Sequence, residues 1–277
     1  MEAKLQIRVQ RYGWDAASEL YEDGWRGPLA PAQQTLLRIA DIKSGERVIE
    51  AACGSGLVTR AIAEAVGPSG QVLATDLSQN MVELTARACA EAGYDWVSAV
   101  RKSADDLGVE GEFDAAVCAL GLMYVPAPGR AAASMARATK PGGRVVATVW
   151  GERRNCGWAE IFPIVDARVV SEVCPLFFAS GAPGSLRRDF ERAGLRDIEE
   201  HRQLEMLAFP DERSLLSAML LGGPVALAVK RFTPETMTEV ESEFLDSVKD
   251  HRASNGSYRI PGEFVTVVGY RSRGCLR

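Results

Sequence analysis

Histidine is nearly absent from this chain, which has only His201 and His251 among 277 residues. Its six cysteines are scattered, and no two form a C-x-x-C pair. Metal sites and disulfide frameworks need such residues in clusters at defined spacings, so we expect neither. Several of the cysteines fall within predicted strands and helices, which favours reduced core thiols and a cytoplasmic location.

Two other features are also missing: an apolar run long enough to cross a bilayer and an excess of basic residues. The net charge is −5, with 47% apolar and 25% charged residues, the composition of an ordinary globular protein. We therefore expect no integral membrane segment, no signal peptide and no nucleic-acid partner. A small molecule is the expected partner, and the composition leaves the oligomeric state open, with a homodimer as one alternative.

The clearest structural pattern lies between Val48 and Asp76. Residues 47–52 form a mostly apolar run that predicts a buried strand, and a helical apolar period follows Gly56. A second apolar run at 71–75 ends at Asp76, so the whole stretch predicts a βαβ unit with parallel strands. Asp76 follows Gly54 by 22 residues, near the spacing at which a carboxylate binds a ribose hydroxyl.

The residues of the glycine turn decide which nucleotide-like ligand is expected. A dinucleotide site needs G-x-G-x-x-G, whereas this turn has Glu50-x-Ala52-x-Gly54-x-Gly56 and no third glycine. An acid beside the turn disfavours a pyrophosphate and suits a ligand with an amine or a sulfonium. The stretch resembles motif I of the class I S-adenosylmethionine (SAM) methyltransferases. The alternative is a buried turn that binds no ligand.

Further segments resemble the same family, and they occur in the family's order. D-L-S-Q-N-M at 76–81 is typical of it, and so is K-P-G-G at 140–143, which we expect to be a tight turn before a fifth strand. W-D-A-A-S-E-L-Y-E at 14–22 resembles the helix that precedes motif I in the UbiE-like small-molecule methyltransferases. Ser103 stands where the family usually has an acceptor for the adenine amino group, so Asp105 is an alternative for that role. The resemblance implies that SAM is the cofactor, S-adenosylhomocysteine the product, and that the cofactor-binding residues are Tyr21, Glu50, Ala52, Gly54, Gly56, Asp76, Leu77, Met81, Ser103, Ala104, Asp105 and Ala119.

The resemblance also implies the fold, an α/β Rossmann-like class I methyltransferase fold with a helical cap. Its seven-stranded sheet should have the order 3-2-1-4-5-7-6, with strand seven antiparallel. We expect helices at 16–21, 31–40 and 158–173, and a closing strand at 264–270. A single domain of residues 1–277 would comprise lid helices (1–46), a SAM-binding core (47–150), cap elements (151–182 and 208–260) and the remainder of the sheet (183–207 and 261–271).

Methyl transfer from a sulfonium is an in-line displacement that positioning alone accelerates strongly, by about 7–11 kcal/mol. The absence of a catalytic triad or metal cluster is therefore compatible with this reaction. Tyr124 and His201 are candidates for a general base or substrate contact. We expect a small hydrophobic or aromatic acceptor, contacted by Trp14, Trp25, Met123, Tyr124, Trp150, Trp158, Phe177 and Phe178. Two alternatives remain: these aromatic residues form only core, or the chain binds SAM but has another reaction or a partner role.

Overall fold

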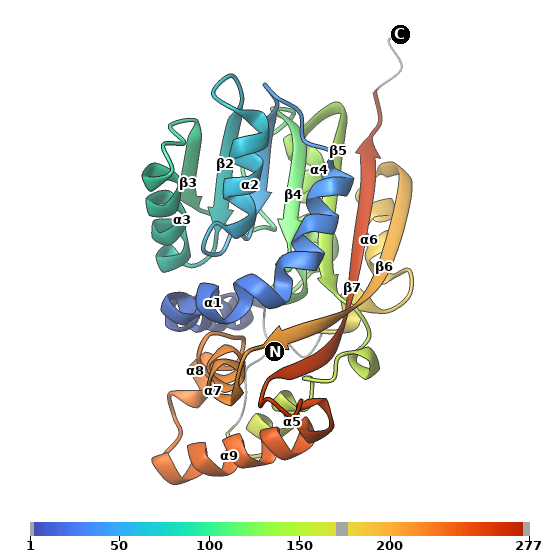
Figure 1. The fold of residues 1–277 in the computed structure, drawn as a ribbon. Helices are drawn as coiled ribbons and strands as arrows, with labels where there is room; N and C mark the ends of the chain where they lie inside the picture. Colours follow the sequence, from blue (N-terminus) through green and yellow to red (C-terminus); the bar gives the residue numbers. More distant parts are fainter. Residues whose placement is uncertain (1–2, 170–176, 274–277) are drawn as a thin grey trace.

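A central sheet of seven strands has the order β3-β2-β1-β4-β5-β7-β6 in the computed structural model, which describes residues 3–169 and 177–273 (Figure 1). Strands β1 to β5 pair in parallel, and β7 is antiparallel to both β5 and β6. The expected strand order and the antiparallel seventh strand are confirmed. The strands are β1 (Arg47–Ala51), β2 (Gln71–Asp76), β3 (Val97–Arg101), β4 (Phe113–Ala119), β5 (Thr139–Trp150), β6 (Leu195–Phe209) and β7 (Tyr258–Arg271).

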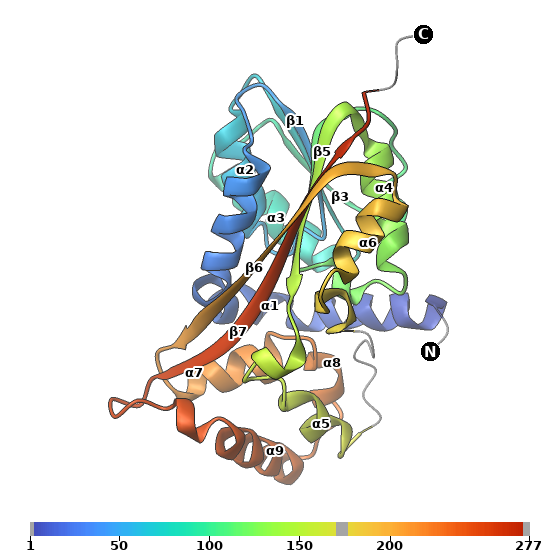
Figure 2. The ribbon, with the colours of Figure 1, turned by 90° about the vertical axis from the view of Figure 1, so that its right-hand side faces the viewer.

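Successive residues of the central strands face opposite sides of the sheet, and both sides are buried. Val48 and Ala115 belong to one apolar cluster, while their neighbours Ile49 and Ala116 belong to another. Helices cover both faces, as parallel sheets require. Helices α2 (Leu57–Val66), α3 (Gln79–Glu91) and the second half of α1 (Ala3–Ala40) cover one face, and α4 (Pro128–Ala138) and α6 (Ser185–Arg192) cover the other (Figure 2).

A second group of helices lies beyond the carboxyl ends of β1, β2, β4 and β5, at the bottom of Figure 1. The sequence assigned residues 208–260 to a helical cap, and most of this second group lies in that range. The group comprises α5 (Ile161–Asp166), α7 (Glu212–Leu216), a π-helical turn (Ser217–Leu221), α8 (Ala226–Val229) and α9 (Pro234–Ser247). Single 3₁₀ turns connect elements at Leu122–Tyr124, Arg153–Asn155, Ala179–Gly181 and Lys249–His251.

The N-terminal segment differs from expectation, because α1 is one helix of 38 residues rather than two short ones. Pro28 and Pro31 lie inside it, and each lacks the N–H that an interior helical residue donates. Figure 1 shows that the helix bends between its two halves instead of ending. The sequence prediction was wrong because it treated Pro31 as the start of a new helix.

Three further predictions need correction. The helix expected at 158–173 is shortened to α5, and residues 170–176 lie outside the described residues. The expected tight turn at 140–143 lies within β5, where the ladder with β4 shifts register and Gly142 has a φ of +82°. Strand β7 starts before residue 264 because Tyr258 pairs with Phe209, which extends the β6–β7 ribbon past the end of β5.

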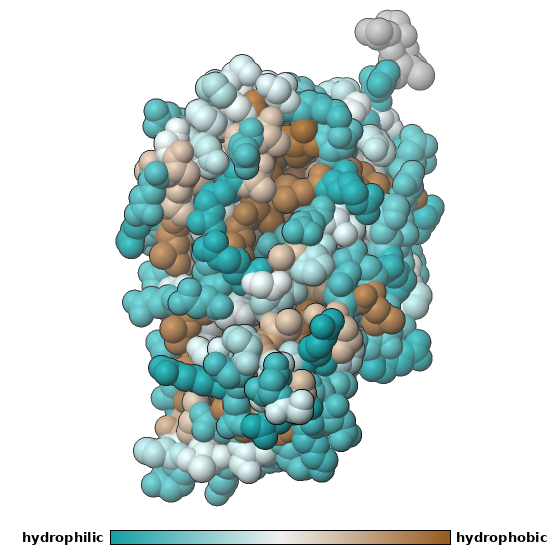
Figure 3. Space-filling view, in the orientation of Figure 1, coloured by the Kyte–Doolittle hydropathy of each residue, from teal (hydrophilic) through white to brown (hydrophobic). Residues whose placement is uncertain are grey.

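The surface in Figure 3 is mostly hydrophilic around its outline, with hydrophobic residues gathered in its upper half, over the sheet. Within the described residues, no helix is long and apolar enough to cross a membrane. Four cysteines there, Cys53, Cys89, Cys118 and Cys156, are buried free thiols.

Candidate active site

The site starts where β1 and β4 end side by side. Ala52 follows β1 with a φ of +56°, and Leu120 follows β4 with a φ of +60°. Residues with side chains seldom adopt this left-handed region, and each such residue costs on the order of 1–3 kcal/mol. A Cβ on the next residue, Gly121, would lie 2.4 Å from the Ala52 Cβ. Two strained chain reversals thus pack against each other, an arrangement that clusters at functional sites.

Asp76 joins the loops that follow β1 and β2. Its Oδ2 accepts a hydrogen bond from the Gly54 amide, and its Oδ1 accepts one from the Ser78 amide, both at 2.9 Å. Gly54 can turn toward the carboxylate because it has a φ of +57°. These two donors fix the carboxylate while leaving each oxygen a further lone pair for the hydroxyls of a ligand.

Two buried carboxyl groups make this region sensitive to charge. Burial raises the pKa of Asp76 to about 6, although the amides of Ser78 and Gly54 counteract it. Burial also raises the pKa of Glu50 to about 8, against the effect of a 2.6 Å hydrogen bond that Thr59 donates. The other Glu50 oxygen has no hydrogen-bond partner among the described residues. A nearby positive charge would offset the cost of ionising both groups, so the region suits a cationic ligand.

The first half of α1 forms one wall of the site. Asp15 accepts hydrogen bonds from the Ser78 hydroxyl at 2.6 Å and the Asn80 amide at 3.3 Å, at the start of α3. Glu22 pairs with Arg60 of α2 at 2.8 Å. Tyr21 lies beside the glycine loop, and burial together with the Asp76 charge raises its pKa well above the usual value. The phenol therefore stays protonated and can donate a hydrogen bond.

Helix α1 and the strand ends enclose a pocket, here called the strand-end pocket, of about 670 Å³ including its open mouth. Nine of the twelve residues expected to bind a cofactor line it: Tyr21, Ala52, Gly54, Asp76, Leu77, Met81, Ser103, Ala104 and Ala119. Glu50 lies beneath the turn, only 1% exposed, and Gly56 begins α2 against Thr85. Asp105 accepts a 2.5 Å hydrogen bond from the Ser103 hydroxyl. The sequence did not single out five other lining residues: Gln10, Lys102, Leu120, Gly121 and Val125.

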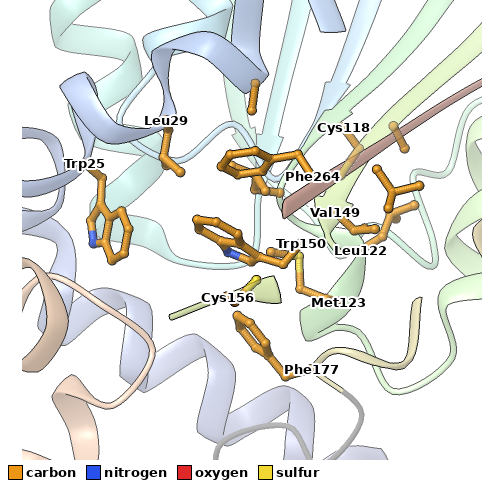
Figure 4. Packing of buried hydrophobic residues seen from close by; sticks show 14 of the residues in the cluster. Trp25, Leu29, Cys118, Leu122, Met123, Val149, Trp150, Cys156, Phe177 and Phe264 are labelled. Atoms are coloured by element: carbon orange, nitrogen blue, oxygen red, sulfur yellow. The ribbon is translucent and has the colours of Figure 1, made fainter. Parts of the chain in front are cut away.

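A second pocket of about 330 Å³ including its open mouth, here called the aromatic chamber, adjoins the strand-end pocket. The two spaces share Trp14, Tyr21, Leu120 and Tyr124. The remaining residues of the chamber are Trp25, Leu29, Trp150, Trp158 and Pro224, so no charged side chain lines it. Figure 4 shows Trp25, Leu29 and Trp150 gathered here.

The other residues expected to contact a substrate lie outside the chamber. Phe177 packs behind it, with ring centroids 5.3 Å from Tyr124 and 5.9 Å from Trp158, and Phe178 packs on Phe177 at 4.8 Å. Met123 is 1% exposed in the core.

The two candidates for a general base are placed very differently. Tyr124 borders both the strand-end pocket and the aromatic chamber. His201 lies on β6 opposite Thr266, with a side chain 42% exposed near Glu199, and it lines neither space. Among the described residues, no group of three or more His, Cys, Asp or Glu side chains could bind a metal.

The lining of the strand-end pocket fits the parts of SAM. Asp76 offers buried acceptor oxygens to a diol, and a base would find apolar surface on Leu77, Met81 and Ala104. The glycine turn leaves room beside Tyr21 for the methionine end. These features define a class I SAM-dependent methyltransferase.

Comparisons with known proteins agree with this class. A model of the methyltransferase domain matches residues 48–143. A demethylmenaquinone methyltransferase of Bacillus cytotoxicus is 30% identical over 178 residues, 59% of this chain and 75% of the relative. A nocamycin O-methyltransferase of Saccharothrix syringae is 27% identical over 239 residues, 80% and 85% of the two chains. The structure of Haemonchus contortus phosphoethanolamine N-methyltransferase 2 with SAM superposes with a TM-score of 0.63 at 16% identity, covering 98% and 60%.

The chain belongs to the family of SAM-dependent methyltransferases that includes the UbiE-like demethylmenaquinone methyltransferases. It is a SAM-dependent methyltransferase, as expected from the acid-led glycine turn.

Proposed function

We propose that this enzyme methylates a small hydrophobic acceptor with a planar ring, which binds in the aromatic chamber. The observation that supports this most directly is the lining of the chamber: six aromatic residues, two aliphatic side chains, a proline and no charge. Such a lining favours apolar ring surfaces and disfavours an ionised substrate, because a charge would lose its hydration there. Trp14, Tyr21, Leu120 and Tyr124 border both spaces, so an acceptor here would lie next to the strand-end pocket.

SAM, when bound, supplies an electrophilic methyl group on a sulfonium. The residues of this chain would bind it in parts: Asp76 by the ribose hydroxyls, Met81 and Ala104 by the base, and the turn at Gly54 by the methionine end. The sulfonium charge would offset the cost of ionising Asp76 and Glu50, and the resulting carboxylates would favour the cationic cofactor over its neutral thioether product. This preference helps the product to leave.

Positioning is the main catalytic contribution that we assign to the protein. Trp14 contacts the rings of both Tyr21 and Tyr124 edge to face, at 5.7 and 4.9 Å. These three rings form the wall at the junction, where they would orient the acceptor and exclude water. Holding two reactants in line contributes about 7–11 kcal/mol to the barrier reduction, so no covalent intermediate is needed. We assign Tyr124 to the acceptor's polar substituent because it borders both spaces.

The named substrates of the relatives support a ring-bearing acceptor. One relative is named for demethylmenaquinone, a quinone, and a second for nocamycin. Whether the methyl group goes to carbon, oxygen or nitrogen depends on the acceptor atom that lies in line with the sulfonium.

The test is the formation of S-adenosylhomocysteine from SAM with a panel of naphthols, reduced naphthoquinones, alkylphenols and charged amines. We expect turnover with the ring compounds and none with the charged amines. SAM binding by calorimetry without turnover for any ring compound would instead support the alternative, a SAM-binding protein with another reaction or a partner role.

A variant that fills the chamber tests its location. Leu29 lines the chamber, and Leu20 on the same helix is 39% exposed, which makes Leu20→Phe a matched control. Leu29→Phe should reduce acceptor-dependent turnover at least tenfold while cofactor affinity stays within about twofold. Unchanged turnover with a well-folded Leu29→Phe protein would place the acceptor elsewhere.

A further inference from the structure

Gln10 is a buried polar residue of α1 to which the sequence assigned no role. Its side chain is only 7% exposed and lines the strand-end pocket. Its carboxamide is not among the buried polar groups that lack a hydrogen-bond partner in the described part of the chain, so its polar atoms are not closed off from the pocket that the residue lines. An amide that opens onto a ligand pocket from a largely buried side chain is placed to form a hydrogen bond with a ligand.

The position of Gln10 along α1 shows which end of the pocket it borders. Tyr21 lies beside Gly54 in the loop after β1, and Asp15 bonds to Ser78 in the loop after β2. Gln10 lies further along the same helix in the same direction. Because an α-helix rises 1.5 Å per residue, Gln10 lies roughly 16 Å from Tyr21. It therefore borders the part of the pocket farthest from the glycine turn.

That part of the pocket suits a flat base but offers few free polar groups from the strand ends. Ser103 already donates its hydroxyl hydrogen to Asp105, and Lys102 donates to the Leu107 carbonyl at 2.6 Å. Asp105 itself does not line the pocket. Gln10 adds both a donor and an acceptor to these walls.

We propose that Gln10 recognises the adenine base of SAM. Its Oε1 accepts a hydrogen bond from the 6-amino group, and its Nε2 donates one to the adjacent ring nitrogen. A carboxamide is the natural complement of this edge, since adenine presents a donor next to an acceptor. Because Gln10 and Asp15 belong to the same helix half, a correct base also helps to hold α1 against the pocket.

The experiment measures binding of two ligands to the full chain by calorimetry. One is S-adenosylhomocysteine, and the other is its analogue with hydrogen in place of the 6-amino group. Gln10→Met keeps the length and the helix propensity of the side chain but removes both polar groups. Gln34 of the same helix is exposed, so Gln34→Met is the matched control.

The wild-type protein should bind S-adenosylhomocysteine about five- to tenfold more tightly than the analogue, the scale of a neutral hydrogen bond. In Gln10→Met this preference should disappear, because the amino ligand loses two hydrogen bonds and the analogue loses only the one to its ring nitrogen, while Gln34→Met keeps the preference. A residue with only a structural role would instead weaken both ligands equally and lower the melting temperature. A preference that survives in a folded Gln10→Met protein overturns the proposal.

Gln10→Glu provides a second test should Gln10→Met fail to fold. A carboxylate still accepts from the amino group but cannot donate to the ring nitrogen. Gln10→Glu should therefore keep its preference for the amino ligand, and equal binding of the two ligands by this variant overturns the proposal.

Discussion

Replacing Asp76 by asparagine should separate cofactor binding from stability. The carboxylate accepts one hydrogen bond on each oxygen, from the amides of Gly54 and Ser78. An asparagine must point its NH₂ group at one of those amides, which loses that bond, and it presents one acceptor fewer to the ribose. We expect S-adenosylhomocysteine affinity to fall by roughly 1.5–3 kcal/mol, or about 10- to 150-fold, the range for hydrogen bonds to charged groups.

Stability should respond differently, and its response should depend on pH. Burial raises the pKa of Asp76 from 3.8 to about 6, a cost of roughly 3 kcal/mol to the folded state once the group is ionised. The sign follows from the raised pKa: stability is full below about 3.8 and falls as the pH rises through about 6. Asparagine removes this penalty but leaves one amide unsatisfied, at about 1–3 kcal/mol. The variant should therefore match the wild type near pH 8 and be less stable near pH 4.

Calorimetry with S-adenosylhomocysteine at pH 8 and urea unfolding at both pH values measure the two effects. Asp105→Asn is the matched control, because Asp105 lies near the pocket without lining it. Affinity within twofold of the wild type in Asp76→Asn would refute the ribose assignment. If only Asp105→Asn lost affinity for S-adenosylhomocysteine, the ribose would instead be assigned to Asp105.

Three further predictions concern the surrounding structure. Because burial raises the Glu50 pKa to about 8, the wild type should lose stability as the pH rises from about 4.5 through about 8, and Glu50→Gln should reduce this loss. Thermal unfolding between pH 5 and 9 measures the pH dependence, and an unchanged slope in the variant would contradict the prediction. Trp158→Ala should cost about 3–5 kcal/mol in urea unfolding, since this side chain is 1% exposed, and a loss below about 1 kcal/mol would show that it does not support the core. Asp15→Ala removes the hydrogen bonds to Ser78 and Asn80, so the cofactor should dissociate about tenfold faster in stopped-flow measurements. An unchanged dissociation rate would show that Asp15 does not help to hold α1 over the bound cofactor.

The sheet and the glycine turn could be predicted because their signals are local. The buried run at 47–51, the turn at Gly54 and the carboxylate at Asp76 lie within 30 residues, and the strand order followed from the family resemblance. The cap of α3 is equally local, since the Ser78 side chain accepts a hydrogen bond from the Met81 amide three residues later.

The features that the sequence did not show depend on contacts between distant segments. Gln10 lines the pocket only because α1 continues through Pro28 and Pro31, bends and crosses the strand ends. Leu120 acquires its left-handed backbone from a reversal packed against the loop after β1, which no local pattern indicates. Residues that meet a ligand from such segments can be identified only when the tertiary arrangement is known.

A crystal structure of the enzyme grown with S-adenosylhomocysteine would show where the cofactor product binds. We predict the ribose hydroxyls on the Asp76 carboxylate, the base between Met81 and Ala104, and the homocysteine beside Gly54 and Tyr21, with its sulfur facing the aromatic chamber. A ligand bound outside the strand-end pocket, or with its sulfur turned away from the chamber, would contradict this prediction.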